Sequence, residues 1–130
     1  MKKVNLMRFY MIFVGISGCF SVLFGAWFAH AGQEMTEVIR FRLVNAQQYQ
    51  IIHTLALLSV IALYQYHASK WLLASASCFF VGVLFFSGSL YIKTFLNFAA
   101  IGKITPLGGI FLALGWLLTI FVSNKLFNKK

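Results

Sequence analysis

The sequence predicts an all-α integral membrane protein, a bundle of four transmembrane helices with a short amphipathic interfacial helix between the first and the second. Of its 130 residues, 61% are hydrophobic and 10% charged, whereas a soluble domain carries about 25% charged residues. Asp and Glu together supply 2 residues, too few for a surface in water. Four apolar runs approach the length of about 20 helical residues that crosses a bilayer. This composition excludes a disordered chain, a disulfide scaffold and a cytosolic enzyme.

The four apolar runs, each bounded by charged or polar residues, define the spans of a single transmembrane domain that covers residues 1–130. Arg8 precedes the first run, Lys93 closes the third, and Pro106 opens the fourth. We place the spans at about 9–29, 46–66, 71–92 and 106–122.

The segment 32–45 between the first two spans mixes charged and apolar residues at short intervals. Glu34, Glu37, Arg40 and Arg42 alternate there with hydrophobic residues. This pattern is typical of an amphipathic helix that lies on the membrane surface. We expect this helix to lead directly into the second span.

The distribution of Lys and Arg predicts the orientation in the membrane. Four spans place both termini and the loop between spans two and three on one side. That side carries Lys2, Lys3, Arg8, Lys70, Lys125, Lys129 and Lys130, and the other carries Arg40, Arg42, Lys93 and Lys103. Because the more basic side of a membrane protein faces the cytoplasm, we expect both termini to be cytoplasmic. The scattered positions of the basic residues do not predict a nucleic-acid surface.

Small residues recur at intervals of three and four along three of the spans. Helices in lipid associate through close backbone approach, which small residues permit. The glycines that we assign to helix packing are Gly15, Gly18, Gly25, Gly82, Gly108 and Gly115. A pore or substrate path along these glycines is the functional alternative.

Polar residues gather where the predicted spans meet the loops of the external side. The set comprises His30, Tyr49, Gln50, His53, Ser87, Ser89, Tyr91 and Thr105. Polar groups in hydrocarbon are costly unless they are paired or face water. We therefore expect a mutually hydrogen-bonded cluster or a polar cavity at the external end. Within it, His53 is either a structural hydrogen-bonding residue or a binding or proton-handling one.

The start of the fourth span suggests a site for an anion or a lipid head group. Thr105 is expected to cap the helix and Pro106 to occupy its first position. Lys93 and Lys103 flank this helix start, whose free N–H groups attract negative charge. Ordinary extension of the lysines toward the membrane surface is the alternative interpretation.

Four stretches of the chain, taken in order, resemble the YgdD-like family of uncharacterised small bacterial inner-membrane proteins, which has animal relatives among small transmembrane proteins. They are GAWFAHA at 25–31, YQIIHTLAL at 49–57, FSGSLY at 86–91, and ITPLGG at 104–109 with Gly115-Trp116 after it. The resemblance covers nearly the whole chain. It implies a bacterial plasma-membrane protein with several helices, and it supplies no established activity and no catalytic residue.

These observations favour a non-enzymatic helical module that binds a partner protein, a lipid head group or a small polar molecule at its external end. No paired intramembrane carboxylates, HExxH motif or nucleophile with its base is present in the sequence. A small oligomeric channel or transporter is the alternative. Less favoured are haem or metal binding through His30 and His53, and an accessory subunit of a respiratory complex. We expect no cofactor. The expected partners are the lipid bilayer around the bundle and either a second copy of the chain or another protein of a membrane complex.

Overall fold

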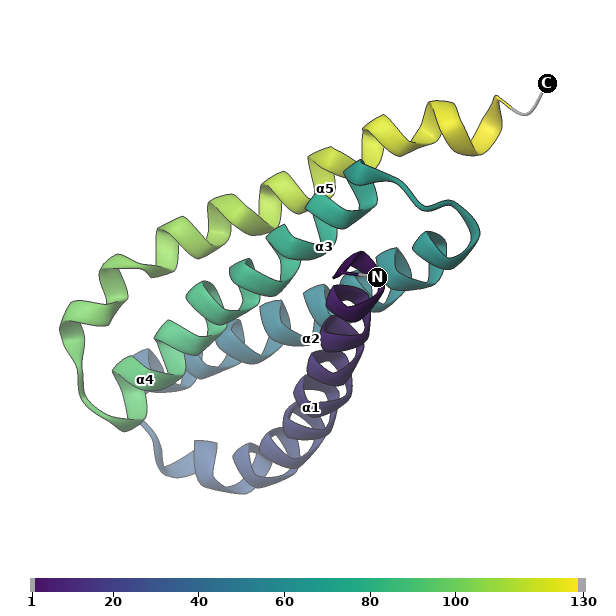
Figure 1. Ribbon diagram of the computed structural model, residues 1–130. Coiled ribbons are helices and arrows are strands. Elements are labelled where there is room, and N and C mark those ends of the chain that lie inside the picture. The colour runs from purple at the N-terminus through teal and green to yellow at the C-terminus, as the bar shows by residue number, and fades with distance from the viewer. Residues whose placement is uncertain (1, 129–130) are drawn as a thin grey trace.

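The computed structural model describes residues 2–128, with Lys125 by its backbone alone, and these residues form one helical bundle (Figure 1). The α-helices are α1 Lys2–Ala31, α2 Glu37–Tyr66, α3 Lys70–Val83, α4 Ser89–Phe95 and α5 Thr105–Phe127. Short 3₁₀ turns, η1 Gly32–Glu34 and η3 Ala99–Lys103, and a π-helical turn, η2 Leu84–Gly88, join them. The all-α prediction is confirmed for the described residues.

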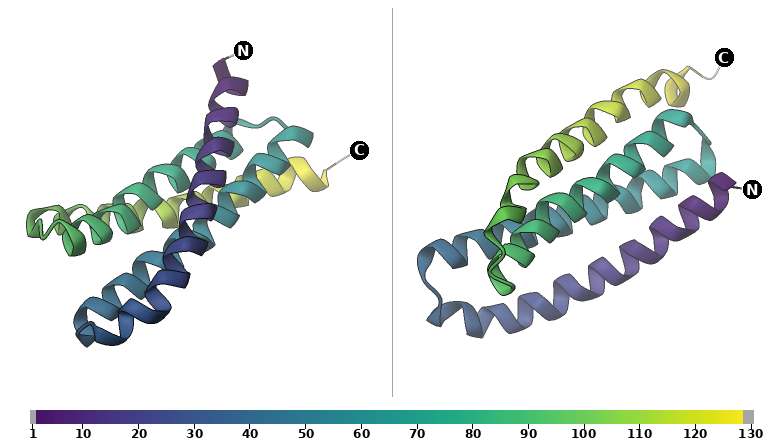
Figure 2. Two further views of the ribbon diagram at one scale, coloured as in Figure 1. Left: turned by 90° about the horizontal axis from the view of Figure 1, so that it is seen from below. Right: turned by 60° about the vertical axis from the view of Figure 1, so that its left-hand side comes forward.

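Four helical segments are long and apolar enough to cross a membrane, as the sequence predicted. They are Lys2–Glu34, Glu37–Tyr66, Lys70–Phe95 and Ala99–Asn124. Both ends of the described chain and the α2–α3 turn lie at one end of the bundle (Figure 2). The opposite end holds η1 and η3, and we call it the η1–η3 end. Lys129 and Lys130, which entered the prediction of orientation, lie outside the described residues.

A separate interfacial helix between the first two spans is not confirmed. Thr36 caps the start of α2, where its side chain accepts a hydrogen bond from the Ile39 N–H, and the helix then continues unbroken to Tyr66. No Gly or Pro lies between Glu37 and Tyr66 to interrupt it. The helix that contains the second span therefore begins nearer the η1–η3 end than residue 46, where we placed the start of the span. Gln50 and His53 consequently lie near the middle of α2.

The third span, Lys70–Phe95, is one long helix that contains a π-helical turn. α3 passes into η2 at Leu84 and resumes as α4 at Ser89 without leaving helical geometry. A π-turn accommodates one extra residue and rotates the side chains that follow it, and such turns are frequent at functional sites. Here it separates Ser87, which faces α2, from Ser89, which faces α5.

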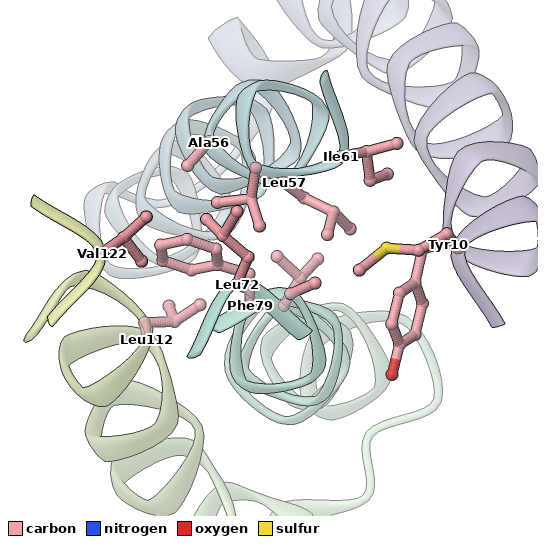
Figure 3. Packing of buried hydrophobic residues seen from close by; sticks show 12 residues of the cluster. Tyr10, Ala56, Leu57, Ile61, Leu72, Phe79, Leu112 and Val122 are labelled. Atoms are coloured by element: carbon pink, nitrogen blue, oxygen red, sulfur yellow. The ribbon is translucent and has the colours of Figure 1, made fainter. Parts of the chain in front are cut away.

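The apolar core lies between α2, α3 and α5, with α1 added at one side (Figure 3). Leu57, Leu72 and Phe79 are fully buried there. In α2 and in the α3–α4 span, 44% of the most apolar window is buried, against 17% in the spans of α1 and α5. The first and fourth spans are therefore the peripheral ones, and their exposed apolar side chains face the membrane.

Three of the predicted packing glycines lie where α5 approaches the third span. A Cβ atom at Gly82 would lie 2.5 Å from Leu112 Cδ2, and one at Gly115 would lie 2.6 Å from the Phe79 ring. At Gly108 an added Cβ would collide with the backbone nitrogen of Phe86. Glycine is thus what lets these two helices approach so closely.

The glycines of α1 divide into two kinds. At Gly25 an added Cβ would lie 2.6 Å from Gln47 Nε2, so α1 and α2 are in close contact there. At Gly15 and Gly18 an added Cβ would contact nothing within 4 Å. The expectation that these two pack against another helix of the chain is wrong, because α1 turns this face away from α2.

Candidate functional site

One hydrogen-bonded group of side chains centres on Gln50, which is buried in α2. Its Nε2 donates to the Ser17 carbonyl oxygen at 3.3 Å and to Ser17 Oγ at 3.0 Å. Its Oε1 accepts from the Tyr91 hydroxyl at 2.8 Å. Ser17 lies midway along α1 and Tyr91 lies on α4, so a single amide joins three spans. Polar atoms in hydrocarbon require such partners, and both ends of this amide have them.

The hydrogen bonds continue along the contact between α1 and α2. Ser17 Oγ and Thr54 Oγ1 are 2.8 Å apart, Ser21 Oγ donates to the Ser17 carbonyl oxygen at 2.8 Å, and Gln47 Nε2 donates to the Ser21 carbonyl oxygen at 2.9 Å. We call this set the mid-depth network; its members are Ser17, Ser21, Gln47, Gln50, Thr54 and Tyr91. It is a polar seam through the middle of the bundle.

Sequence reasoning placed Gln50 and Tyr91 in the candidate site but did not include Ser17 or Thr54. Serine and threonine in an apolar span give little signal alone. The signal that could have found them is matched spacing. Ser17 and Ser21 are four residues apart on α1, and Gln50 and Thr54 are four apart on α2. Residues at that interval share one face of a helix.

His53 is buried but does not belong to the mid-depth network. Its Nδ1 lies 2.7 Å from the Tyr49 carbonyl oxygen, and because a carbonyl only accepts, Nδ1 carries the proton. In the neutral ring Nε2 is then the acceptor. The imidazole lies among the rings of Tyr49, Phe79 and Trp116, with centroids 5.7, 5.8 and 6.1 Å away. This side of α2 faces α3 and α5, whereas Gln50 faces α1.

His30 and His53 do not come together. His30 is exposed near the end of α1, 13 residues beyond Ser17, which is about 20 Å along a helix. Ser17 contacts Gln50, three residues before His53, and Thr54, the residue after it. Among residues 2–128, no group of three or more His, Cys, Asp and Glu side chains could hold a metal ion. The idea that the two histidines approach each other as a ligand pair is wrong.

The serines around the π-helical turn bond to both neighbouring helices. Ser87 Oγ donates to the Ala46 carbonyl oxygen of α2 at 2.7 Å. Ser89 Oγ donates to the Phe86 carbonyl oxygen at 2.9 Å and lies 2.6 Å from Thr105 Oγ1. Thr105 is therefore a side-chain partner of the third span.

The expectation that Thr105 caps α5 is wrong. The capping position is Ile104, whose backbone is already helical at φ −82° and ψ −23°, and no side chain caps this helix start. Pro106 still lies in the first turn, where its missing N–H is tolerated. Because the helix begins one residue earlier, the Thr105 hydroxyl turns toward Ser89 instead of toward the backbone of α5.

Basic side chains surround α4 at the η1–η3 end. Lys93, which is half-buried, folds over η3, where a Cβ built at Gly102 would lie 3.2 Å from Lys93 Nζ. Lys103 follows Gly102 and is exposed. On the α2 side, Arg42 Nη1 lies 3.5 Å from Thr94 Oγ1. Lys93 and Lys103 thus share the η3 side, and Arg42 lies against α4 from the side of α2.

A crevice of about 200 Å³ opens beside the mid-depth network, between α1 and the π-helical turn. Apolar residues such as Phe13, Phe20 and Leu84 line it together with Gln50 and Tyr91. Gln50 and Tyr91 already bond to each other. The crevice therefore offers mainly apolar contacts, as a lipid chain would require.

Comparison with known proteins finds relatives of this chain among membrane proteins of unknown function. A family profile described as "Protein of unknown function (DUF423)" matches residues 24–109. A UPF0382 membrane protein of Haemophilus influenzae is 36% identical over 89% of this chain and 94% of its own length. The UPF0382 inner membrane protein YgdD of Escherichia coli K12 is 33% identical over 94% of each chain. A UPF0382 membrane protein of Staphylococcus epidermidis is 31% identical over 92% of this chain and 98% of its own. No solved structure matches the chain.

Proposed function

The chain belongs to the DUF423 family of small bacterial inner membrane proteins, whose function is unknown, and on that premise we propose that it binds the anionic head group of a phospholipid. The site is the η3 side of the η1–η3 end, formed by Lys93, Lys103 and the start of α5. The protein acts as a non-enzymatic membrane module in this proposal. Both termini face the cytoplasm, so the site faces outward.

The observation that carries the proposal is the position of Lys93. Its ammonium group folds back over Gly102, beside Lys103. Lys93 of α4 and Lys103 of η3 thus bring two positively charged residues to one short turn, and an anion bound there would be attracted to both. The two acidic residues of the chain are Glu34, which ends η1, and Glu37, which begins α2, so neither belongs to α4 or η3. A phosphate would supply the negative charge that α4 and η3 lack.

The location suits a lipid better than a free solute. One residue, Ile104, separates η3 from α5. α5 is a helix of 23 residues that is apolar and mostly exposed along its length. A phospholipid whose phosphate lies at η3 can therefore extend its acyl chains along the outer face of α5. Leu107 and Ile110, both exposed, begin this face.

The mid-depth network supports a structural role for the middle of the bundle. Gln50 uses both ends of its amide within the chain, and Ser17 and Thr54 bond to each other. Groups that are already paired stabilise helix association. We therefore assign ligand recognition to the η1–η3 end and helix association to the network.

The test compares a double substitution at the site with a matched one at the other end. Lys93→Ala with Lys103→Ala removes two positive charges at η3, and Lys2→Ala with Lys3→Ala removes two at the start of α1. Native mass spectrometry from mild detergent then counts retained phosphatidylglycerol and phosphatidylethanolamine. Because each basic residue contributes about 1 kcal/mol to anionic lipid binding, we expect the η3 double variant to bind phosphatidylglycerol about 30-fold more weakly.

The control variant is expected to retain phosphatidylglycerol at the level of the unmodified protein. Phosphatidylethanolamine retention should change in neither variant, since it carries no net charge. Equal loss of phosphatidylglycerol from both double variants would contradict the proposal, because it would show a general effect of net charge.

A further inference from the structure

The α2 helix presents three faces, and one of them is uncovered. Gln47 and Gln50 face α1, while Ala46 and His53 face the third span and α5. The remaining face points away from the rest of the bundle. Its exposed residues are Phe41, Gln48, Ile52, Leu55, Ser59, Ala62 and Tyr66. We call this the outer face of α2.

Gln48 is unusual on this face because it is a long polar side chain turned toward lipid. It is exposed, and its amide makes no hydrogen bond to any residue between 2 and 128. Ser59 and Ser123, which are also exposed, each donate to a carbonyl oxygen of their own helix. An unpaired amide in hydrocarbon is costly. Gln48 therefore lacks a partner that the other two have.

The depth of Gln48 prevents its amide from reaching the membrane surface. It lies six residues, about 9 Å along the helix, further into the bundle than Arg42. Arg42 itself bonds to Thr94, one residue before the end of α4. Gln50, two residues after Gln48, lies level with Ser17, which is midway along α1. A glutamine side chain is too short to cross the distance of about 9 Å between Gln48 and the level of Arg42.

The residues of the outer face form one stripe along α2. Together with the half-buried Asn45 they recur at intervals of four and three, through 41, 45, 48, 52, 55 and 59. This repeat averages 3.6 residues, the period of the α-helix, so the stripe is one straight seam that a second helix can meet. Asn45, on the same seam, uses its amide N–H on the Phe41 carbonyl oxygen and keeps its own oxygen free.

We propose that the outer face of α2 is a homodimer interface, in which Gln48 bonds to Gln48 of a second copy. An amide is both donor and acceptor, so two copies related by a twofold axis satisfy each other. The face from 45 to 66 carries no Asp, Glu, Lys or Arg, so like charges do not oppose the pairing. The interface leaves η3 free, and this inference does not depend on lipid binding there.

The test is disulfide cross-linking in liposomes of a variant in which Cys19 and Cys78 are replaced by Ala. Ile52→Cys places a thiol on the outer face of α2, and Ile110→Cys places one on the exposed face of α5. The two isoleucines are matched, at 53% and 57% exposed. We expect Ile52→Cys to cross-link at least about tenfold faster, the effect of one polar pair of 1–2 kcal/mol.

A second comparison tests Gln48 itself. In the Ile52→Cys protein, Gln48→Leu is expected to lower cross-linking about tenfold, while Gln48→Asn retains most of it. Gln48 is exposed, so neither change disturbs the packing of the monomer. Equal rates for Ile52→Cys and Ile110→Cys, or unchanged cross-linking in Gln48→Leu, would overturn the proposal.

Discussion

Two helix pairs of this bundle are held together in different ways. α5 meets the third span through glycines, and at Gly108 the two backbones are so close that no Cβ fits. α1 meets α2 through side-chain hydrogen bonds, with Gln50, Ser17 and Thr54 at their centre. Hydrogen bonds also reach α5, from Ser75 to the Gly115 carbonyl oxygen and between Ser89 and Thr105, and Gly25 lets α1 approach α2. The two contacts therefore differ in emphasis: close packing dominates the first, and a polar network dominates the second.

Both kinds of contact follow from the properties of lipid as the solvent of the helices. Lipid tails are as apolar as the helices, so burial of hydrophobic surface gives little drive for association. Close packing gains dispersion energy, and hydrogen bonds gain energy because hydrocarbon offers no competing partner. Added volume should therefore be most damaging where α5 meets the third span, and loss of a polar group most damaging where α1 meets α2.

The largest effect is expected at Gly108. Gly108→Ala adds one methyl group against the backbone of Phe86, which cannot move aside as a side-chain tip would. We expect a loss of about 3 kcal/mol in the free energy of unfolding, the upper part of the range for overpacking. Denaturation in mixed detergent micelles measures it, and Gly109→Ala is the control because its nearest contact would be 3.8 Å away. Equal stability of the two variants would show that the close approach is not needed.

A smaller effect is expected at Gln50. Gln50→Leu keeps most of the volume but removes the bonds to Ser17 and leaves the Tyr91 hydroxyl without its partner. We expect a loss of about 1–2 kcal/mol, since interhelical hydrogen bonds in membranes average about 0.6 kcal/mol each. The same unfolding measurement checks it. A stabilised Gln50→Leu protein would mean that α1 is held by packing alone.

The smallest effect is expected at Gly15. An added Cβ meets nothing within 4 Å, and alanine is the better helix former in an exposed position. Gly15→Ala should therefore leave the free energy of unfolding unchanged or raise it by less than about 1 kcal/mol. A loss as large as that of Gly108→Ala would show that this face of α1 packs against something after all.

The positions of the spans could be predicted from the sequence, because length and hydropathy decide them. The start of α2 could not. Arg40 and Arg42 read as residues outside the membrane, so the second span was placed from residue 46. The helix begins at Glu37 instead, because nothing breaks it and Arg42 bonds to Thr94 at the end of α4. The helix thus begins about two and a half turns before residue 46, and Gln50 lies near its middle instead of near its start.

The members of the candidate site were predicted from the sequence in part. Gln50 with Tyr91, and Ser89 with Thr105, are brought together. His53 lies instead among the rings of Tyr49, Phe79 and Trp116, on the side of α2 that faces α3 and α5. Such placements depend on which neighbour each face meets, and a single sequence does not report that.

The most direct test of the contrast between the two contacts is a double-mutant cycle. Ser17→Ala and Gln50→Leu are made singly and together, and the free energy of unfolding is measured in the same micelles. A second cycle pairs Gln50→Leu with Gly82→Ala on the α5 contact. We predict a coupling energy of about 0.6–1.7 kcal/mol for Ser17 with Gln50 and none beyond error for Gly82 with Gln50. Equal coupling in both cycles would contradict the assignment of hydrogen bonding to α1 and close packing to α5.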